Sequence, residues 1–459
     1  MEQITKPHCG ARLDRLPDCR WHSSMFAIVA FGLLVCWSNA VGGLILAQLK
    51  ALGWTDNSTT ATFSAITTAG MFLGALMGGI IGDKTGRRNA FILYEAIHIA
   101  SMVVGAFSPN MDFLIACRFV MGVGLGALLV TLFAGFTEYM PGRNRGTWSS
   151  RVSFIGNWSY PLCSLIAMGL TPLISAEWNW RVQLLIPAIL SLIATALAWR
   201  YFPESPRWLE SRGRYQEAEK VMRSIEEGVI RQTGKPLPPV VIADDGKAPQ
   251  AVPYSALLTG VLLKRVILGS CVLIAMNVVQ YTLINWLPTI FMTQGINLKD
   301  SIVLNTMSMF GAPFGIFIAM LVMDKIPRKT MGVGLLILIA VLGYIYSLQT
   351  SMLLITLIGF FLITFVYMYV CYASAVYVPE IWPTEAKLRG SGLANAVGRI
   401  SGIAAPYAVA VLLSSYGVTG VFILLGAVSI IVAIAIATIG IETKGVSVES
   451  LSIDAVANK

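Results

Sequence analysis

Charged side chains are scarce in this chain of 459 residues. Only 12% of the residues are Asp, Glu, Lys or Arg, whereas 56% are hydrophobic. A soluble domain has about twice that charged fraction, so the composition excludes a soluble protein. The alternating ten-residue segments of outer-membrane barrels are also missing, because the hydrophobic residues form continuous runs long enough to span a bilayer as helices. The chain is therefore predicted to be an all-α polytopic membrane protein.

Residues for catalysis, redox chemistry and metal binding are few. The chain has three histidines, none near a nucleophile motif, and no Gly-rich loop ending in Lys-Ser or Lys-Thr, so neither an enzyme nor an ATP-driven pump is indicated. None of the seven cysteines is placed for an external disulfide. His8, Cys9, Cys19 and His22 match no zinc-site spacing. We therefore expect no metal, no cofactor and a disordered amino-terminal tail.

The basic residues are distributed unevenly along the chain. A net charge of +9 would suggest nucleic acid as the partner of a soluble protein, but 27 of the 33 Lys and Arg residues fall on one side of the predicted spans. The opposite connections contain only Lys50, Arg181 and Lys299. By the positive-inside rule both termini are cytoplasmic, which requires an even number of spans. The lipid bilayer, and not nucleic acid, is the predicted partner.

The hydrophobic runs predict 12 transmembrane helices in two six-helix repeats, at residues 25–49, 60–82, 89–107, 111–139, 147–173, 182–202, 262–291, 302–323, 331–348, 352–378, 390–415 and 418–440. The corresponding division is a cytoplasmic tail (1–24), an amino-terminal half (25–202), a cytoplasmic loop (203–261), a carboxy-terminal half (262–440) and a second tail (441–459). Within the loop, apolar residues at helical spacing predict an amphipathic helix over 214–229.

The two halves also repeat at the level of charged motifs. Residues 82–88 recur as 323–329, an offset of 241 residues, and the half-ends at 203–207 and 442–445 correspond as well. The acidic and basic residues after spans four and ten match at similar offsets, as Glu138 with Arg145 and Glu380 with Arg389. Two parallel repeats of six helices are an architecture of transporters whose binding site lies near the midplane between the halves.

These motifs resemble those of the major facilitator superfamily over essentially the whole chain. The loop motif is matched by Gly78, Asp83, Gly86, Arg87 and Arg88, while Arg118 with its following glycines and residues 203–209 resemble sugar porters. The seventh span, with Tyr281 and Trp286, is more similar to bacterial metabolite and organic-acid proton symporters.

The resemblance implies a secondary transporter that moves a small polar metabolite, namely a sugar, a sugar acid or another organic acid, by alternating access. We further expect a monomer in a bacterial inner membrane, because long external loops are lacking, and we expect proton coupling. A uniporter of a sugar or polyol stays open as an alternative, as does a transporter-like membrane sensor that binds without translocating.

The repeated loop charges are predicted to form a cytoplasmic gate. When the cytoplasmic mouth closes, carboxylates can meet arginines and helix amino termini, and when it opens they separate. The alternative is that they only fix topology, each contributing less than about 1 kcal/mol. The predicted gate residues are Asp83, Arg87, Arg88, Glu138, Arg145, Asp324, Arg328, Glu380 and Arg389.

Two arginines are predicted to lie deep in the membrane, Arg118 in span four and Arg399 in span eleven. Deep arginines are functional-site candidates, and here they favour a substrate with a carboxylate over a neutral sugar. Amides and aromatic rings suit hydroxylated or planar organic substrates. The predicted substrate-binding set is Asn39, Arg118, Asn157, Gln280, Tyr281, Asn285, Trp286, Asn395 and Arg399.

The residue that usually carries the proton in sugar porters of the proton-coupled type is absent here. They place an aspartate on the first helix, facing the arginine of the fourth, but the corresponding stretch here is Trp37-Ser38-Asn39-Ala40. Asn39 can form hydrogen bonds but does not titrate. The predicted proton-coupling pair is therefore Glu95 and His98, which share one face of span three. A structural pair is the alternative, and it would leave uniport as the mode of transport.

Overall fold

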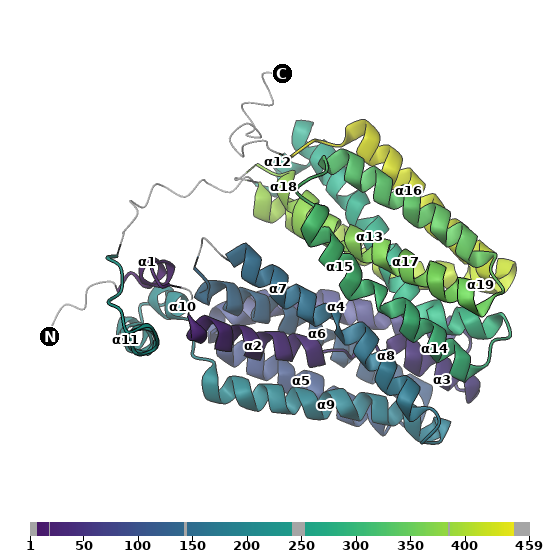
Figure 1. Cartoon of the computed structure of the whole chain (residues 1–459), viewed down its shortest axis with the longest axis horizontal. Helices are drawn as coiled ribbons and strands as arrows, with labels where there is room; N and C mark the ends of the chain where they lie inside the picture. The colour runs from purple at the N-terminus through teal and green to yellow at the C-terminus, as the bar shows by residue number, and fades with distance from the viewer. Residues whose placement is uncertain (1–6, 18, 142–144, 241–252, 384–385, 445–459) are drawn as a thin grey trace. The chain divides into compact units, whose positions relative to one another are not determined.

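The computed structural model describes residues 7–17, 19–141, 145–240, 253–383 and 386–444. Every regular element in these ranges is a helix (Figure 1). Nine helices in the described ranges are long and apolar enough to cross a membrane. The prediction of an all-helical membrane protein is thereby confirmed.

Six predicted spans are single helices whose ends lie within a few residues of the predicted ones. They are long because each is a nearly uninterrupted apolar run, in which intrahelical bonds satisfy the backbone where no water can. These helices are α4 (Asn57–Thr85), α5 (Arg87–Ala106), α6 (Met111–Tyr139), α9 (Ala176–Tyr201), α13 (Gly260–Thr293) and α16 (Arg328–Ser347).

Four other predicted spans are each divided between two or more helical elements. The first divides into α2 (Arg20–Val35) and α3 (Gly42–Ala51). Ser38 and Asn39 lie in this break, and such side chains compete with the helix for backbone hydrogen bonds. The remaining interrupted spans are α7 (Arg145–Asn157) with α8 (Ser159–Leu170), α14 (Leu298–Met309) with α15 (Gly311–Val322), and α17 (Met352–Cys371) with η1 (Tyr372–Tyr377) and α18 (Val378–Glu380).

The last two predicted spans lie in one helical element, α19 (Lys387–Ile439). It bends at Gly417, whose φ of 65° and ψ of −160° are not helical. Gly417 lies between residue 415, where the eleventh predicted span ends, and residue 418, where the twelfth begins. Glycine adopts a positive φ without strain, so the chain can turn at this residue. The number of twelve spans stays a prediction.

The chain forms two compact units that do not follow the predicted halves. The first contains residues 1–39, 70–159 and 184–246, and the second contains 40–69, 160–183 and 247–459. Within the second unit, α3 packs against α13, and a Cβ on Gly43 would collide with the backbone of Ile284 and Asn285. The predicted domain boundaries group the chain by repeat, whereas these units group it by packing, so the boundaries stay a prediction.

Close backbone contact joins α4 and α6 in the first unit. A Cβ on Gly78 would lie 2.8 Å from the Cα of Ala127, and Cβ atoms on Gly74 and Gly126 would also meet backbone atoms of the facing helix. Only glycine permits this approach, as in other small-residue contacts between membrane helices.

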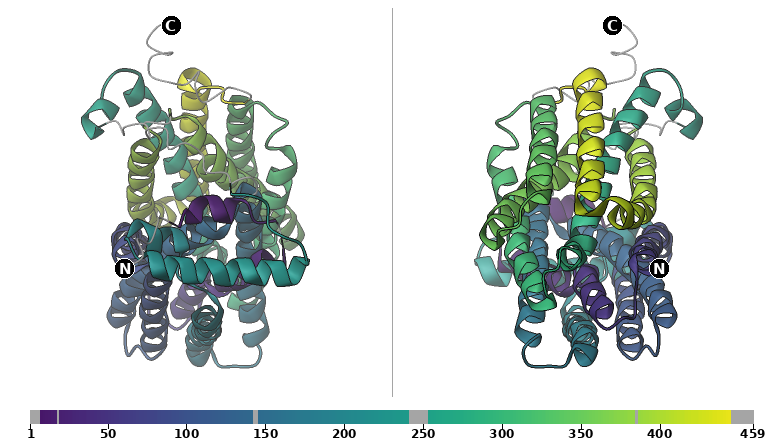
Figure 2. Two further views of the ribbon diagram at one scale, coloured as in Figure 1. Left: turned by 90° about the vertical axis from the view of Figure 1, so that its left-hand side faces the viewer. Right: turned by 90° about the vertical axis from the view of Figure 1, so that its right-hand side faces the viewer.

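Three further helices of the first unit lie together in Figure 1, namely α1 (Cys9–Asp14), α10 (Pro206–Ser211) and α11 (Tyr215–Thr233). Helix α11 confirms the predicted amphipathic helix and runs crosswise to the long helices of this unit, seen end-on in Figure 1 and along its length in Figure 2. Helix α1 overturns the expected disordered tail: Cys9 and Leu13 are fully buried against α10 and α11.

Candidate functional site

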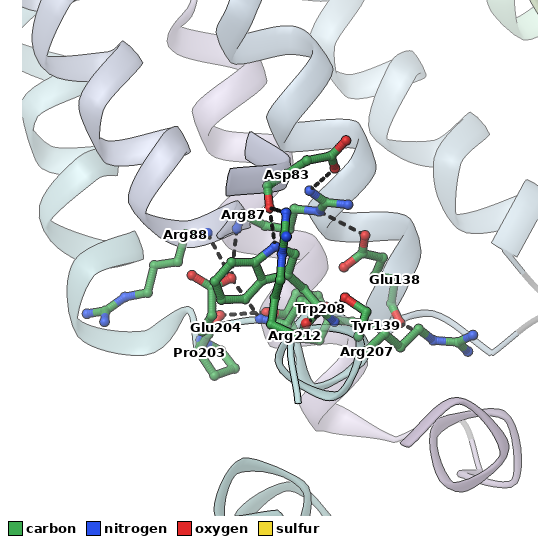
Figure 3. A network of polar contacts seen from close by, with 12 residues as sticks. Asp83, Arg87, Arg88, Glu138, Tyr139, Pro203, Glu204, Arg207, Trp208 and Arg212 are labelled. Carbon is green, nitrogen blue, oxygen red and sulfur yellow. Dashed lines mark hydrogen bonds and ion pairs between the residues drawn. The ribbon is translucent and has the colours of Figure 1, made fainter. Parts of the chain in front are cut away.

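The first charge cluster lies where α4 ends and α5 begins (Figure 3). Arg87 Nη1 donates to Asp83 Oδ1 at 2.6 Å, and its Nε donates to Glu138 Oε1 at 2.9 Å. Arg87 is mostly buried, whereas Asp83 is two-thirds exposed. The arginine therefore ties the ends of α4 and α6 to the start of α5. Arg145 begins α7, and its side chain lies outside the described residues.

A third carboxylate, Glu204, caps the amino terminus of α5. Its Oε1 accepts the backbone N–H groups of Arg87 at 2.8 Å and Arg88 at 3.2 Å. The approach requires Gly86, whose φ is 100° and whose Cβ would collide with the Glu204 carboxylate. The Arg88 side chain points away from Asp83 and Glu138 in Figure 3 and donates to the Trp199 carbonyl at 2.6 Å. Arg88 contributes to this cluster through its backbone.

The second unit holds a matching charge cluster. Arg328 Nη2 lies 3.2 Å from Asp324 Oδ1, and its Nε lies 3.0 Å from Glu380 Oε2. Glu442 caps α16 by accepting the backbone N–H groups of Arg328 at 2.8 Å and Lys329 at 3.1 Å.

The two capping carboxylates were missed as site residues, although the correspondence of the half-ends at 203–207 and 442–445 was the signal that could have found them. Burial alone would raise the pKa of Glu442, but these N–H groups and that of Lys444 lower it below its ordinary value. The guanidinium of the predicted member Arg389 lies 5.1 Å from the ring centre of Tyr254.

A buried polar chain runs through the first unit from α5 to α6. His98 Nδ1 lies 3.4 Å from Glu95 Oε2, and His98 Nε2 lies 2.7 Å from the Ser38 hydroxyl. Arg118 Nη1 donates to the Ser38 carbonyl at 2.7 Å. All four side chains are at most 1% exposed. The other Glu95 oxygen has no partner among the described residues.

Ser38 joins the two ends of this chain because it lies in the break between α2 and α3. Outside a helix its carbonyl is available to Arg118, while its hydroxyl meets His98. Asn39 follows it and is half-buried. Discontinuous helices supply such backbone groups in many transporter sites. The predicted pair of Glu95 and His98 is in contact. From the sequence alone, Ser38 and Asn39 were equal candidates for hydrogen bonding, and it is Ser38 that contacts His98.

The predicted substrate residues are divided between the units. Asn157, in the first, donates to its own helix at the Ser153 carbonyl. In the second, Gln280 and Tyr281 are half-buried, and Asn285 and Trp286 are buried on the same helix, α13.

Two further predicted residues lie on α19. Asn395 is exposed and donates to the Ser391 carbonyl, which does not single it out as a ligand-binding residue. Arg399 Nη1 is buried and has no partner among the described residues.

Contacts in the second unit join helices of the predicted first and second halves. The amide of Asn305 on α14 donates to the Ser164 hydroxyl on α8 at 3.2 Å, and Tyr160 meets the ring of Tyr367 edge to face. Gln48 on α3 is fully buried, with neither amide atom partnered among the described residues. Gln48 carried no distinguishing signal in the sequence. The described residues contain no group of ligands suited to a metal ion.

The comparisons with known proteins agree with this fold. A family profile described as "Sugar (and other) transporter" matches residues 24–455. The chain is 44% identical over 455 residues to the inner membrane metabolite transport protein YdjE of Escherichia coli, covering 98% of this chain and 99% of that one. It is 26% identical to the niacin transporter NiaP of Acinetobacter baylyi, covering 96% and 99%.

A solved structure of the xylose transporter XylE of E. coli, in an inward-open conformation, has a TM-score of 0.74 to this chain at 16% identity. The match covers 94% of this chain and 99% of that one. At this identity the likeness establishes the fold alone.

Proposed function

The chain belongs to the sugar (and other) transporter family of the major facilitator superfamily, and we propose that it is a proton symporter for a small organic acid. It moves the acid by alternating access between two six-helix halves, as a monomer with twelve spans and cytoplasmic termini. The sided distribution of Lys and Arg supports this orientation. The E. coli relative is an inner membrane protein, which supports the same location here.

The buried chain of Glu95, His98, Ser38 and Arg118 is the observation that favours proton coupling. An ionised Glu95 and a positive Arg118 balance each other through the two residues between them. A proton on Glu95 removes the negative charge and leaves the charge of Arg118 for a substrate carboxylate. Proton and acid then load together, because either one bound alone would leave an uncompensated charge in the membrane.

Uniport is the second candidate, and it is favoured by Asn39, which stands where related symporters carry a titrating residue. The two modes separate in proteoliposomes. We expect Glu95→Gln to abolish uphill uptake under a pH gradient while counterflow exchange continues, because exchange needs no net proton movement. Glu177→Gln makes the same chemical change at an exposed position on α9 and should leave both unchanged. Uphill uptake by Glu95→Gln would refute the role of Glu95.

An acidic substrate is supported by Arg399, whose buried Nη1 lacks a protein partner among the described residues. The names of the relatives do not decide the substrate, since they include a niacin transporter and an arabinose-proton symporter. Removing a hydrogen bond to a charged group costs about 1.5–3 kcal/mol, which is roughly a 10- to 100-fold change in affinity.

Matched acid and neutral compounds test this proposal. Nicotinate with nicotinamide, and gluconate with glucose, differ chiefly in charge. Arg399→Gln should raise the KM for the transported acid at least tenfold and change that for its neutral partner less than twofold. If the protein transports a neutral sugar and Arg399→Gln leaves the KM for that sugar unchanged, the substrate is a neutral sugar and the proposal of an acidic substrate is refuted.

The two charge clusters are proposed as the gate of this transporter. Each ties three helix ends to one arginine, Arg87 in one and Arg328 in the other, and each adds a capping carboxylate. Such clusters stabilise one conformation of the gate and must be broken to reach the other, so they set the rate of exchange and not the affinity of the substrate site. The matched geometry of both clusters supports this role over topology alone.

A further inference from the structure

Helix α1 is docked on α10 and α11 by apolar contacts. Cys9, Leu13 and Leu16 are fully buried. They belong to one hydrophobic cluster with residues of the two other helices, namely Trp208, Leu209, Ala218, Met222, Ile225 and Val229. Three buried apolar side chains in so short a segment are a reason for it to hold a fixed position, because removing apolar surface from water opposes the entropy cost of ordering the chain.

Ion pairs also fasten this amino-terminal segment to α11. Arg12 binds Glu219 and also Glu226, whose Oε2 lies 2.6 Å from Arg12 Nη2. Arg15 Nη2 lies 2.6 Å from the other oxygen of Glu226. Burial alone would raise the pKa of Glu226, but the hydrogen bonds from the two arginines lower it below its ordinary value. The side chains of Arg12 and Glu226 are only 14% and 12% exposed, so solvent weakens their attraction less than at a surface pair.

Helix α10 connects α1 to the first charge cluster. Arg207 Nη2 binds Asp14 at 3.0 Å, while its Nε donates to the Glu138 carbonyl at 3.1 Å. Trp208 Nε1 donates to the Asp83 carbonyl at 2.7 Å. Figure 3 shows Arg207 and Trp208 beside the residues that hold Arg87. The same short helix therefore touches the amino-terminal segment on one side and the backbone of two gate carboxylates on the other.

We propose that α1 is a working part of the gate: its docking, fastened by Arg12, holds α10 against Asp83 and Glu138 and so stabilises the first charge cluster. Arg12 is a positioning residue, since it acts through α10 and touches none of the gate residues directly. When α1 leaves, α10 loses the Asp14 partner of Arg207 and the apolar cover of Trp208. The inference rests on the proposed gate.

Docking can be read from the reactivity of Cys9. Burial, and then the hydrogen bond with Glu210, raise the pKa of this thiol to about 12. A docked Cys9 is thus protonated and shielded at pH 7.5, whereas an undocked one has a pKa of about 8.5 and reacts with maleimide as a thiolate. Full-length protein with the other six cysteines replaced by serine, in nanodiscs, gives a single reporter thiol.

The gate itself can be read by hydrogen–deuterium exchange of residues 82–90 and 204–212, which needs no substrate. Arg12→Gln should raise the rate of Cys9 labelling more than tenfold and speed exchange in both segments at least threefold. Arg12→Lys should fall between Arg12→Gln and the unmutated protein. Arg223→Gln is the matched control: Arg223 also pairs with Glu219, at 2.7 Å, but it lies on α11 and is not one of the arginines of the amino-terminal segment, so both measurements should stay unchanged.

Leu13→Asp is a second way to undock α1, because it buries a charge in the apolar cluster. If either variant exposes Cys9 while exchange at 82–90 stays unchanged, α1 does not act on the gate and the proposal fails. If neither exposes Cys9, the docking itself is refuted. Thermal melting of each variant verifies that the membrane helices remain folded.

The proposed gate is tested separately by Asp83→Asn. If this variant transports as fast as the unmutated protein, the gate assignment fails even where exchange still links α1 to residues 82–90. If Asp83→Asn is slow and the α1 variants leave exchange unchanged, only the present inference fails.

Discussion

Replacing Gly78 by alanine tests the backbone contact between α4 and α6. The added Cβ would lie 2.8 Å from the Cα of Ala127 and 2.9 Å from its carbonyl oxygen. Carbon atoms in contact are about 3.5–4.0 Å apart, so the two helices must separate by roughly 0.7 Å. Overpacking of this kind costs about 1–3 kcal/mol.

Gly79 provides the matched comparison, since a Cβ there would meet nothing within 4 Å. Both substitutions are Gly→Ala in the same helix turn, so the gain in helix propensity of about 1 kcal/mol is common to them and cancels. The difference between Gly78→Ala and Gly79→Ala therefore isolates the packing cost of about 1–3 kcal/mol. Equilibrium unfolding of both variants in one detergent measures it.

Gly78→Ala should be the less stable variant, and it should also transport more slowly, because α4 and α6 carry Asp83 and Glu138 of the first charge cluster. Equal stability of the two variants would show that the helices separate without cost. In that case the close approach seen at Gly78 contributes nothing measurable to the fold.

Three further outcomes are expected. Asp83→Asn should slow uptake severalfold while equilibrium binding of the transported acid is retained; parallel loss of both would place Asp83 in the binding site. Glu442 has a lowered pKa, so its cap on Arg328 and α16 should stabilise the protein above the ordinary Glu pKa of about 4.3 and fade as pH falls through the lowered value; Glu442→Gln should flatten this part of the stability–pH curve. Asn305→Ala and Ser164→Ala should show a coupling of about 0.5–1.5 kcal/mol in a double-mutant cycle of unfolding, and strict additivity would exclude their hydrogen bond.

Much of the fold could be predicted because the bilayer imposes long apolar helices. The ends of α5 and α16 fall near charged loop motifs that repeat along the chain, and Gly417 falls where a turn between spans was expected. Breaks inside apolar runs were harder to predict from the sequence, because a few polar residues such as Ser38 barely change the mean hydropathy of the run. The contacts that Ser38 makes in the break, with His98 and Arg118, come from helices distant in the sequence.

The charged site was predictable in part for a similar reason. Arg87 and Arg328 stand in motifs whose spacing places a carboxylate one turn away, so Asp83 and Asp324 could be assigned from the sequence. Glu204 lies more than a hundred residues from the α5 terminus that it caps, and only tertiary packing reveals that contact. Helix α1 was missed because six helical residues have no periodic pattern to read, and their partners lie about 200 residues away.

The break between α2 and α3 has a consequence for how this protein tolerates mutation. Arg118 donates to the backbone carbonyl of Ser38, whereas His98 contacts the Ser38 hydroxyl. Substitutions at position 38 that keep the break can remove the histidine contact yet cannot delete the carbonyl that anchors the arginine. A single substitution at position 38 can therefore remove the contact with His98, whereas no side-chain replacement there removes the carbonyl that accepts from Arg118; that contact is lost through position 38 only if the backbone is reshaped.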